Sequence, residues 1–243
     1  MSAKKFMRKL FNTIFPVKCA CCQKISEKAD AEDILCQKCR EIIEETAAYD
    51  CMGCKNPPHL CSCKKAEHIS EISFAYFYSG EKLKRAIYKM KRANLYYINE
   101  FFAKGMYNSL KSNVRIRMEG IDLVTDAPRM KGSINFYGYN QTKALAKLIS
   151  RYAGIPYRPL LVASRSHDTE QKSLSKARRG QNVKNKFAAA KSIKKTGGAL
   201  KGKNILLIDD VVTTGSTLSE CAKIMKNMGA GNVYALCAAS VLS

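Results

Sequence analysis

The sequence predicts an α/β fold, a mainly parallel sheet with flanking helices, preceded by a small cysteine-rich module. Two observations carry this prediction. From residue 72 onward, apolar strand-like runs alternate with helical segments, the order that gives a parallel sheet covered by helices. Nine of the eleven cysteines lie between Cys19 and Cys63. A length of 243 residues accommodates both a small module and a domain of ordinary size.

Three segments are expected: a helix in residues 1–16, the cysteine-rich module in residues 17–68 and the α/β domain in residues 69–243. The first segment is amphipathic, because its apolar residues recur at about one helical turn with lysines on the other face, and Pro16 ends it. Since a helix this short offers little apolar area, we expect it to dock on the protein's own core rather than on a membrane.

The α/β domain is predicted to contain alternating strands and helices. Its first strand is rich in aromatic residues, and a later one, Asn204 to Ile208, is a run of branched apolar residues suited to burial on both faces. The strands are expected at residues 72–78, 123–125, 160–163, 204–208 and 233–239, and the helices at residues 81–91, 97–111, 141–151 and 216–228.

The chain is strongly basic. It has 42 Lys and Arg against 20 Asp and Glu, a formal charge of +22. Residues 141–203 alone hold sixteen of these cations and two acids, Asp168 and Glu170. Such a field attracts nucleic acid, phosphorylated metabolites or an anionic membrane surface. The alternative, a solvated basic surface that only aids solubility, does not explain why the cations are concentrated in one stretch.

Neither a secretory signal nor a membrane span is expected. The basic amino terminus lacks an uninterrupted apolar stretch and a small-residue cleavage site. No apolar run approaches the roughly 20 residues that cross a bilayer. We therefore expect a cytoplasmic protein, with peripheral contact at the inner membrane face as the alternative, and clustered thiols in a reducing compartment indicate a metal.

Four cysteines have the spacing of a structural zinc ribbon. Cys19-x2-Cys22 and Cys36-x2-Cys39 offer two tight turns whose four thiolates suit tetrahedral Zn²⁺. Spacing alone does not decide whether Cys19 or Cys21 is the first ligand. A module of about 50 residues with few large apolar side chains needs such a metal to fold.

A second cysteine set departs from this pattern. Cys51-x2-Cys54 is followed by Cys61-x-Cys63, whose gap is one residue short, and His59 could replace one member. The alternatives are a second zinc ion and reduced thiols without metal. The two remaining cysteines, Cys221 and Cys237, lie in apolar segments and are interpreted as buried small hydrophobic residues.

The most informative segment is residues 205–217. Four branched apolar residues are followed by Asp209 and Asp210, then by a turn of small hydroxylated residues with one glycine that opens a helix. Backbone N–H groups at a helix amino terminus, together with hydroxyl donors, suit a phosphate monoester. Carboxylates repel phosphate, so the two aspartates must face another part of the ligand, and a ribose diol supplies two donors. The alternative is an acidic helix cap with no ligand.

This segment resembles the signature of type I phosphoribosyltransferases, and the whole chain resembles the ComF family, which joins a zinc ribbon to a domain of that fold. The resemblance implies a site for 5-phosphoribosyl-1-pyrophosphate (PRPP), with Asp209 and Asp210 on the ribose hydroxyls and residues 213–217 around the 5-phosphate. The PRPP-binding residues that it implies are Asp209, Asp210, Val211, Thr213, Thr214, Gly215, Ser216, Thr217, Pro128, Arg129 and Arg165. The catalytic residues that it implies are Asp209, Asp210 and Arg178.

Two further blocks carry the resemblance. Ala127-Pro128, with residues 138–141 after it, resembles the pyrophosphate-side loop and the family's "RGFNQ" block. Residues 165–187 resemble the family's "R…T…Q…L…R…N…F" block, which includes the catalytic loop. Tyr137 stands where the family usually has Arg, which removes a cation near the pyrophosphate; Arg129 or Lys131 is the candidate replacement.

The family resemblance implies Mg²⁺ as the companion of PRPP, because this ion prefers oxygen ligands and phosphate partners. It also implies a role in DNA uptake during natural transformation, with single-stranded DNA and competence-machinery proteins at the inner membrane face as partners. We found no general base for a nucleobase acceptor, and binding does not establish transfer. The alternative function is a nucleic-acid-binding or adapter protein with a phosphoribosyltransferase fold and no turnover.

A short segment supports the nucleic-acid interpretation. Cations and tyrosines are interleaved there, as in grooves that neutralise a single strand and stack its bases. The alternative is surface lysines beside core tyrosines. The residues concerned are Tyr88, Lys89, Lys91, Arg92, Tyr96 and Tyr97.

Overall fold

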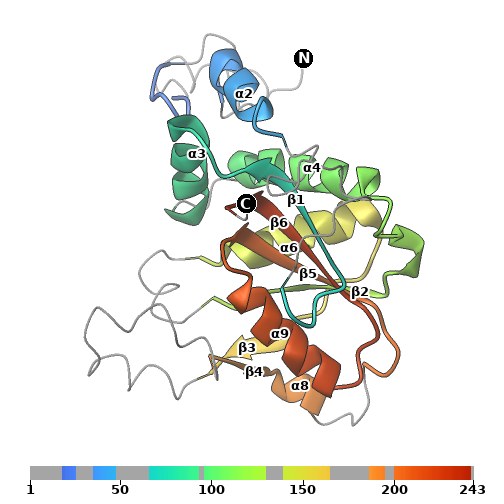
Figure 1. The fold of residues 1–243 in the computed structure, drawn as a ribbon. Helices are drawn as coiled ribbons and strands as arrows, with labels where there is room; N and C mark the ends of the chain where they lie inside the picture. Colours follow the sequence, from blue (N-terminus) through green and yellow to red (C-terminus); the bar gives the residue numbers. More distant parts are fainter. Residues whose placement is uncertain are drawn as a thin grey trace, which may run out of the picture.

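The computed structural model describes residues 18–25, 35–47, 66–92, 96–129, 139–164, 186–194 and 200–241. Its centre is a four-stranded parallel sheet in the order β1-β6-β5-β2 (Figure 1). The strands are β1 (Glu71–Phe77), β2 (Leu123–Asp126), β5 (Ile205–Val212) and β6 (Val233–Ser240). Two short antiparallel strands, β3 (Leu161–Ala163) and β4 (Phe187–Ala189), form a separate ribbon.

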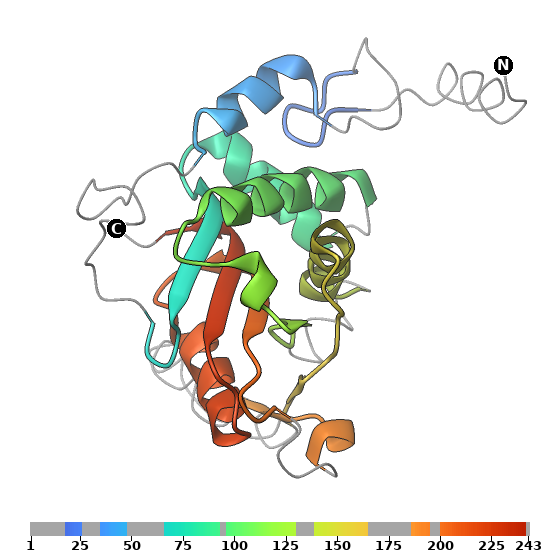
Figure 2. The ribbon, with the colours of Figure 1, turned by 90° about the vertical axis from the view of Figure 1, so that its right-hand side faces the viewer.

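Helices cover both faces of the sheet. On one face, α3, α4 and α6 pack against Leu206, Ile208 and Leu236. On the other, α9 packs against Leu207 and Ala235. Figure 2 shows α6 and α9 on opposite sides of the strands. The helices are α2 (Gln37–Glu44), α3 (Glu81–Arg92), α4 (Tyr96–Ser112), α6 (Gln141–Ala153), α8 (Lys191–Lys194) and α9 (Ser216–Asn227), with a 3₁₀ turn η1 (Met118–Gly120).

Residues 205–208 of β5 and 235–238 of β6 serve the two faces in turn, because side chains alternate across a strand. This explains why continuous apolar runs, rather than alternating ones, mark these central strands. The hydrophobic core therefore lies in two layers, one on each side of β5 and β6.

The described part of the cysteine-rich module packs on the α3 and α4 side of the domain (Figure 1). The Cys21 thiol donates to the Lys82 carbonyl at 3.3 Å, near the start of α3. The Phe77 N–H at the end of β1 donates to the Thr46 carbonyl at 2.8 Å. Buried Cys19, Cys21 and Ile43 join the same apolar core as α3 and α4. The boundary expected at residue 68 stays a prediction.

The predicted fold class is confirmed: a parallel sheet carries helices on both faces, and a cysteine cluster precedes it. One detail differs. The strand expected to end at Ile208 continues to Val212, because Asp209 and Val211 pair with Cys237 and Ala239 of β6. The aspartates are therefore strand residues rather than the first residues of a loop. Helices α2 and α8 and strand β4 were not expected, since each is short and lacks a clear period.

Several predictions concern residues outside the described ranges. They are the helix in residues 1–16, the second cysteine set (Cys51, Cys54, Cys61 and Cys63) and the loop arginines Arg165 and Arg178. Among the described helices, none combines the length and hydropathy that crossing a bilayer requires.

Candidate functional site

The carboxyl end of β5 brings two carboxyl groups beside a hydroxyl-rich turn. Asp209 shares a rung with Cys237, whose side chain is buried on the α9 face. Asp210 contacts side chains of α3 and α6 on the other face. Alternation along the strand therefore directs consecutive carboxyl groups to opposite faces of the sheet.

Asp210 is held by three donors. Lys91 Nζ lies 3.2 Å from Oδ1, and the backbone N–H of Val211 donates to the same oxygen at 2.7 Å. The Gln141 side-chain amide donates to Oδ2 at 2.5 Å. Each donor comes from a different place: Lys91 from α3, Gln141 from the start of α6 and Val211 from β5 itself. The Asp210 carboxylate thus contacts donors from three elements of the fold.

Asp209 has a different environment. Burial, and then the neighbouring charge of Asp210, raise the pKa of Asp209 to about 8. Its Oδ1 accepts the backbone N–H of Asp210 at 2.8 Å, and the charge of Lys91 only partly offsets the burial. Near neutral pH the group is therefore mostly a neutral acid, which an approaching cation would ionise.

The turn after β5 has the features of a phosphate cradle. Gly215 adopts a left-handed conformation (φ 74°) and precedes the first residue of α9. A Cβ at this position would lie 2.7 Å from the Cβ of Ala66, so both the backbone angle and the space require glycine. Thr213, Thr214 and Ser216 are exposed. Hydroxyls and N–H groups at the start of a 12-residue helix favour an anionic oxygen ligand.

Two hydroxyls of this turn are already ordered by each other. The oxygens of Thr214 Oγ1 and Ser216 Oγ lie 2.7 Å apart, and the Ser216 N–H is 3.4 Å from Thr214 Oγ1. Thr217 is half-buried within the first turn of α9. Of the predicted 213–217 segment, Thr213, Thr214 and Ser216 are therefore exposed at the end of β5, and Gly215 is buried beneath them.

Pro128 and Arg129 follow β2 at the neighbouring strand end. The Arg129 guanidinium donates to the Gln141 side-chain oxygen, and to the backbone carbonyl of Lys91 at 3.3 Å. Arg129 thus supports the residues around Asp210. It was proposed above as a replacement for the family's pyrophosphate-side arginine, yet these contacts engage it within the protein.

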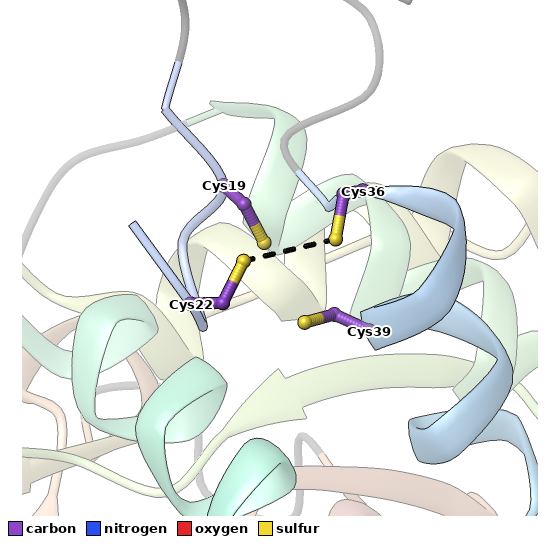
Figure 3. A group of neighbouring side chains, drawn as sticks. All are labelled: Cys19, Cys22, Cys36 and Cys39. Atoms are coloured by element: carbon purple, nitrogen blue, oxygen red, sulfur yellow. Dashed lines mark hydrogen bonds between the residues drawn. The ribbon is translucent and has the colours of Figure 1, made fainter. Parts of the chain in front are cut away.

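The cysteine cluster is the second candidate site. The sulphur atoms of Cys19, Cys22, Cys36 and Cys39 all lie within 4.8 Å of one another. Figure 3 shows that they point toward one shared space. The Cys22 and Cys36 sulphurs are 3.8 Å apart. Tetrahedral zinc with Zn–S bonds of about 2.3 Å requires sulphurs roughly 3.8 Å apart, so the donor set fits such an ion.

Local backbone geometry positions these thiols. The first pair sits in a tight turn closed by the Cys19 N–H donating to the Lys24 carbonyl at 2.9 Å, and Cys36 caps α2. Burial opposes ionisation of the Cys19 thiol, but backbone N–H donors outweigh it and lower its pKa to about 7. One of these donors is Cys21 N–H, 3.4 Å from the Cys19 sulphur.

Cys21 points elsewhere. Its thiol donates to the Lys82 carbonyl, and burial raises its pKa to about 12. The structure therefore resolves the alternative that spacing left open, since Cys19 lies in the cluster and Cys21 packs against α3. Cys221 and Cys237 are fully buried, and burial raises the pKa of both thiols.

Sequence reasoning assigned no role to Lys91 and Gln141 at the candidate ligand site. Lys91 was grouped with surface cations, and nothing in the helical period separates it from its neighbours. Gln141 was quoted only as part of a family block. Its position at the start of a helix opposite β5 is the signal that could have placed it.

Comparison with known proteins shows a phosphoribosyltransferase-type domain and a similarity to competence proteins. A family model described as "Phosphoribosyl transferase domain" matches residues 143–242, which include β5, the hydroxyl turn and α9. The chain is 28% identical over 172 residues to Competence protein F of Haemophilus influenzae, a match that covers 70% of this chain and 73% of that protein. The chain is thus similar to the ComF family, as its sequence predicted. The cysteine cluster before the domain agrees with this assignment.

Other relatives of this ComF-like chain are more partial. It is 31% identical to DNA utilization protein YhgH of Escherichia coli K12 over 100 residues, 41% of each protein. Among solved structures, a glutamine PRPP amidotransferase from B. subtilis is 20% identical, with a TM-score of 0.40 over 63% of this chain and 30% of that one.

Proposed function

We propose that this ComF-like protein binds 5-phosphoribosyl-1-pyrophosphate with Mg²⁺ at the carboxyl end of β5. One observation carries the proposal: Asp209 and Asp210 lie near the carboxyl end of strand β5, with two residues between them and a turn with exposed hydroxyls that leads through a left-handed Gly215 into α9. The turn offers donors for a 5-phosphate. Asp210 offers acceptors for a ribose diol.

The donor chemistry of the site also fits a magnesium ion, which takes oxygen ligands and keeps phosphate partners. Asp209 and Asp210 are the residues beside which it would sit. When bound, Mg²⁺ would supply positive charge that offsets the charge of the pyrophosphate. The protein's own residues hold the phosphate end through the turn, and Asp210 orients the sugar.

Calorimetric titration with PRPP, with and without Mg²⁺, tests this function. The variants are Asp209→Asn/Asp210→Asn and, as a matched control, Asp122→Asn. Asp122 lies next to β2 at the opposite, amino end and pairs with Lys203 at 3.9 Å. Saturable Mg²⁺-dependent binding that only the double variant loses supports the proposal. Absence of binding at millimolar PRPP by the folded wild-type protein would refute it.

A structural zinc ion at the four-cysteine cluster belongs to the same proposal. The sulphur geometry supports it, and the ion would hold α2 to the turn at Cys19. Its role would be to shape the module that packs on α3.

We further propose a role in DNA uptake through contact with single-stranded DNA. The names of Competence protein F and DNA utilization protein YhgH motivate the idea. The α3 helix supports it, since Tyr88 is 54% exposed and the Arg92 guanidinium lies 4.6 Å from its ring centroid. Exposed Lys84 and Arg85 lie on the same helix. An exposed ring among cations is the unit that stacks a base and neutralises its phosphates.

Oligonucleotide binding as a function of salt concentration tests this second function. Tyr88→Ala/Arg92→Gln should weaken single-strand binding about 5- to 100-fold, since stacking contributes about 1–3 kcal/mol per base. The double variant should also flatten the salt slope by about 0.7 for the lost phosphate contact. Arg151→Gln, a change of an exposed cation on α6, is the control and should leave affinity nearly unchanged. Equal affinity in all three proteins would argue against the α3 surface.

A further inference from the structure

The carboxyl-terminal end of α3 reaches the candidate ribose site. Lys91 lies in the last turn of this helix, and its ammonium is 3.2 Å from Asp210 Oδ1. Its side chain is 35% exposed, whereas that of Asp210 is 12% exposed. A cation from a distant part of the chain is thus seated on the carboxylate that the proposed function assigns to the ribose.

Asp210 has little acceptor capacity left. A carboxylate has about four lone-pair positions. Three are used, by Lys91 and the Val211 N–H on Oδ1 and by Gln141 on Oδ2. A vicinal diol needs two acceptors. Binding of both hydroxyls by Asp210 therefore requires at least one present donor to leave.

Two of the three donors are fixed in place. Val211 donates from the backbone of a central strand. Gln141 is 2% exposed, and its oxygen accepts from Arg129. Lys91 is partly exposed and reaches Asp210 through a flexible stem, so it is the donor that can move.

The main chain at Lys91 is nevertheless well anchored. Arg129 donates to the Lys91 carbonyl at 3.3 Å, and the Tyr139 hydroxyl donates to the Met90 carbonyl. These bonds supply donors to carbonyls in the last turn of α3, which have no donor within the helix. Arg129 and Tyr139, which lie after β2 and before α6, therefore hold the end of α3 beside the site. The Lys91 side chain is 35% exposed, so its ammonium can still move.

We propose that Lys91 is a ligand-binding cation of this site, exchanged from Asp210 to the pyrophosphate when PRPP enters. The inference rests on the proposed function. The exchange replaces one anionic partner by another, so the ammonium keeps a charged partner and Asp210 gains room for the diol. A second reason is that Arg129, a cation at the neighbouring strand end, is already engaged with Gln141.

Two ligands distinguish this role from a merely structural one. Ribose 5-phosphate has the sugar and the 5-phosphate but no pyrophosphate. Lys91→Met should weaken PRPP binding about 10- to 100-fold, as expected for loss of a charged hydrogen bond. The same variant should bind ribose 5-phosphate as well as the wild-type protein or severalfold better, because the competitor for Asp210 is gone.

The controls are Lys91→Arg and Lys89→Met, with thermal unfolding measured for every variant. Arginine keeps the charge and should keep PRPP affinity within about fivefold. Lys89→Met removes the same charge from the same helix and should change neither affinity by more than about twofold, since residues two apart do not share a helix face. Equal loss of both ligands in Lys91→Met, or no loss of PRPP, would overturn the inference while the proposed function stands. A wild-type protein that binds neither ligand would overturn both.

Discussion

Asp209 and Asp210 are consecutive residues of β5 whose carboxyl groups serve opposite faces of the sheet. Asp210 meets Lys91 and Gln141 on the α3 and α6 side. Asp209 lies beside buried Cys237 on the α9 side, and burial raises its pKa to about 8. One carboxyl group is thus paired with a cation and the other is held mostly neutral. The two acids of the signature therefore respond differently to substitution and to pH.

Replacing Asp209 should make the protein more stable in a pH-dependent way. The pKa of Asp209 is about 8 in the folded protein against an ordinary 3.8. Between these values the folded state binds the extra proton, so stability falls as pH rises, by at most about 1.4 kcal/mol per pH unit. Asp209→Asn removes this loss. Its unfolding midpoint should exceed that of the wild type at pH 8, and the difference should shrink toward pH 4.5.

Urea unfolding at pH 4.5, 6 and 8 measures this difference, with Asp122→Asn as the control. Asp122, whose side chain is 43% exposed, shows the effect of the same Asp-to-Asn change at a position that is not buried. A pH-independent difference for Asp209→Asn would show that the carboxyl group is not held neutral.

Ligand binding should release a proton if Asp209 ionises beside the incoming cation. Burial raises the pKa of Asp209 to about 8, so the folded protein carries this proton near neutral pH. Binding of PRPP with Mg²⁺ should therefore strengthen as pH rises to about 8 and then level off. Calorimetry at pH 7 in buffers of different ionisation enthalpy gives the proton count. We expect nearly one proton released by wild type and none from this position in Asp209→Asn.

The sequence anticipated those parts of the molecule that follow from local pattern. The run Ile205 to Ile208 predicted a central strand, and the strand was confirmed. Spacing predicted the tight turns of the cysteine cluster. The contact between Lys91 and Asp210 joins residues 119 positions apart and depends on how α3 docks, which no local pattern specifies. The length of β5 was likewise underestimated, because pairing with β6 carries the strand past the polar aspartates.

Substitution of single cysteines should separate the metal ligands from their neighbour. Cys36→Ser removes a member of the four-sulphur cluster, so bound Zn²⁺ should fall by one equivalent and the protein should lose stability. Cys21→Ser should keep the full zinc content, because this thiol contacts the Lys82 carbonyl instead. Elemental analysis of the purified proteins and thermal unfolding with a chelator provide the measurements. Zinc loss in Cys21→Ser, or none in Cys36→Ser, would contradict the assignment.

Gly215 should be the least replaceable residue of the hydroxyl turn. Its φ of 74° costs about 1–3 kcal/mol for any other residue. A methyl group there would also meet Ala66 at 2.7 Å. Gly154 at the end of α6 has a similar φ of 69° but nothing within 4 Å, so Gly154→Ala isolates the backbone cost. In denaturant unfolding, Gly215→Ala should lose more stability than Gly154→Ala, and it alone should lose PRPP binding. Equal losses of stability in the two variants would mean that Ala66 moves aside and that the turn accommodates a methyl group at residue 215.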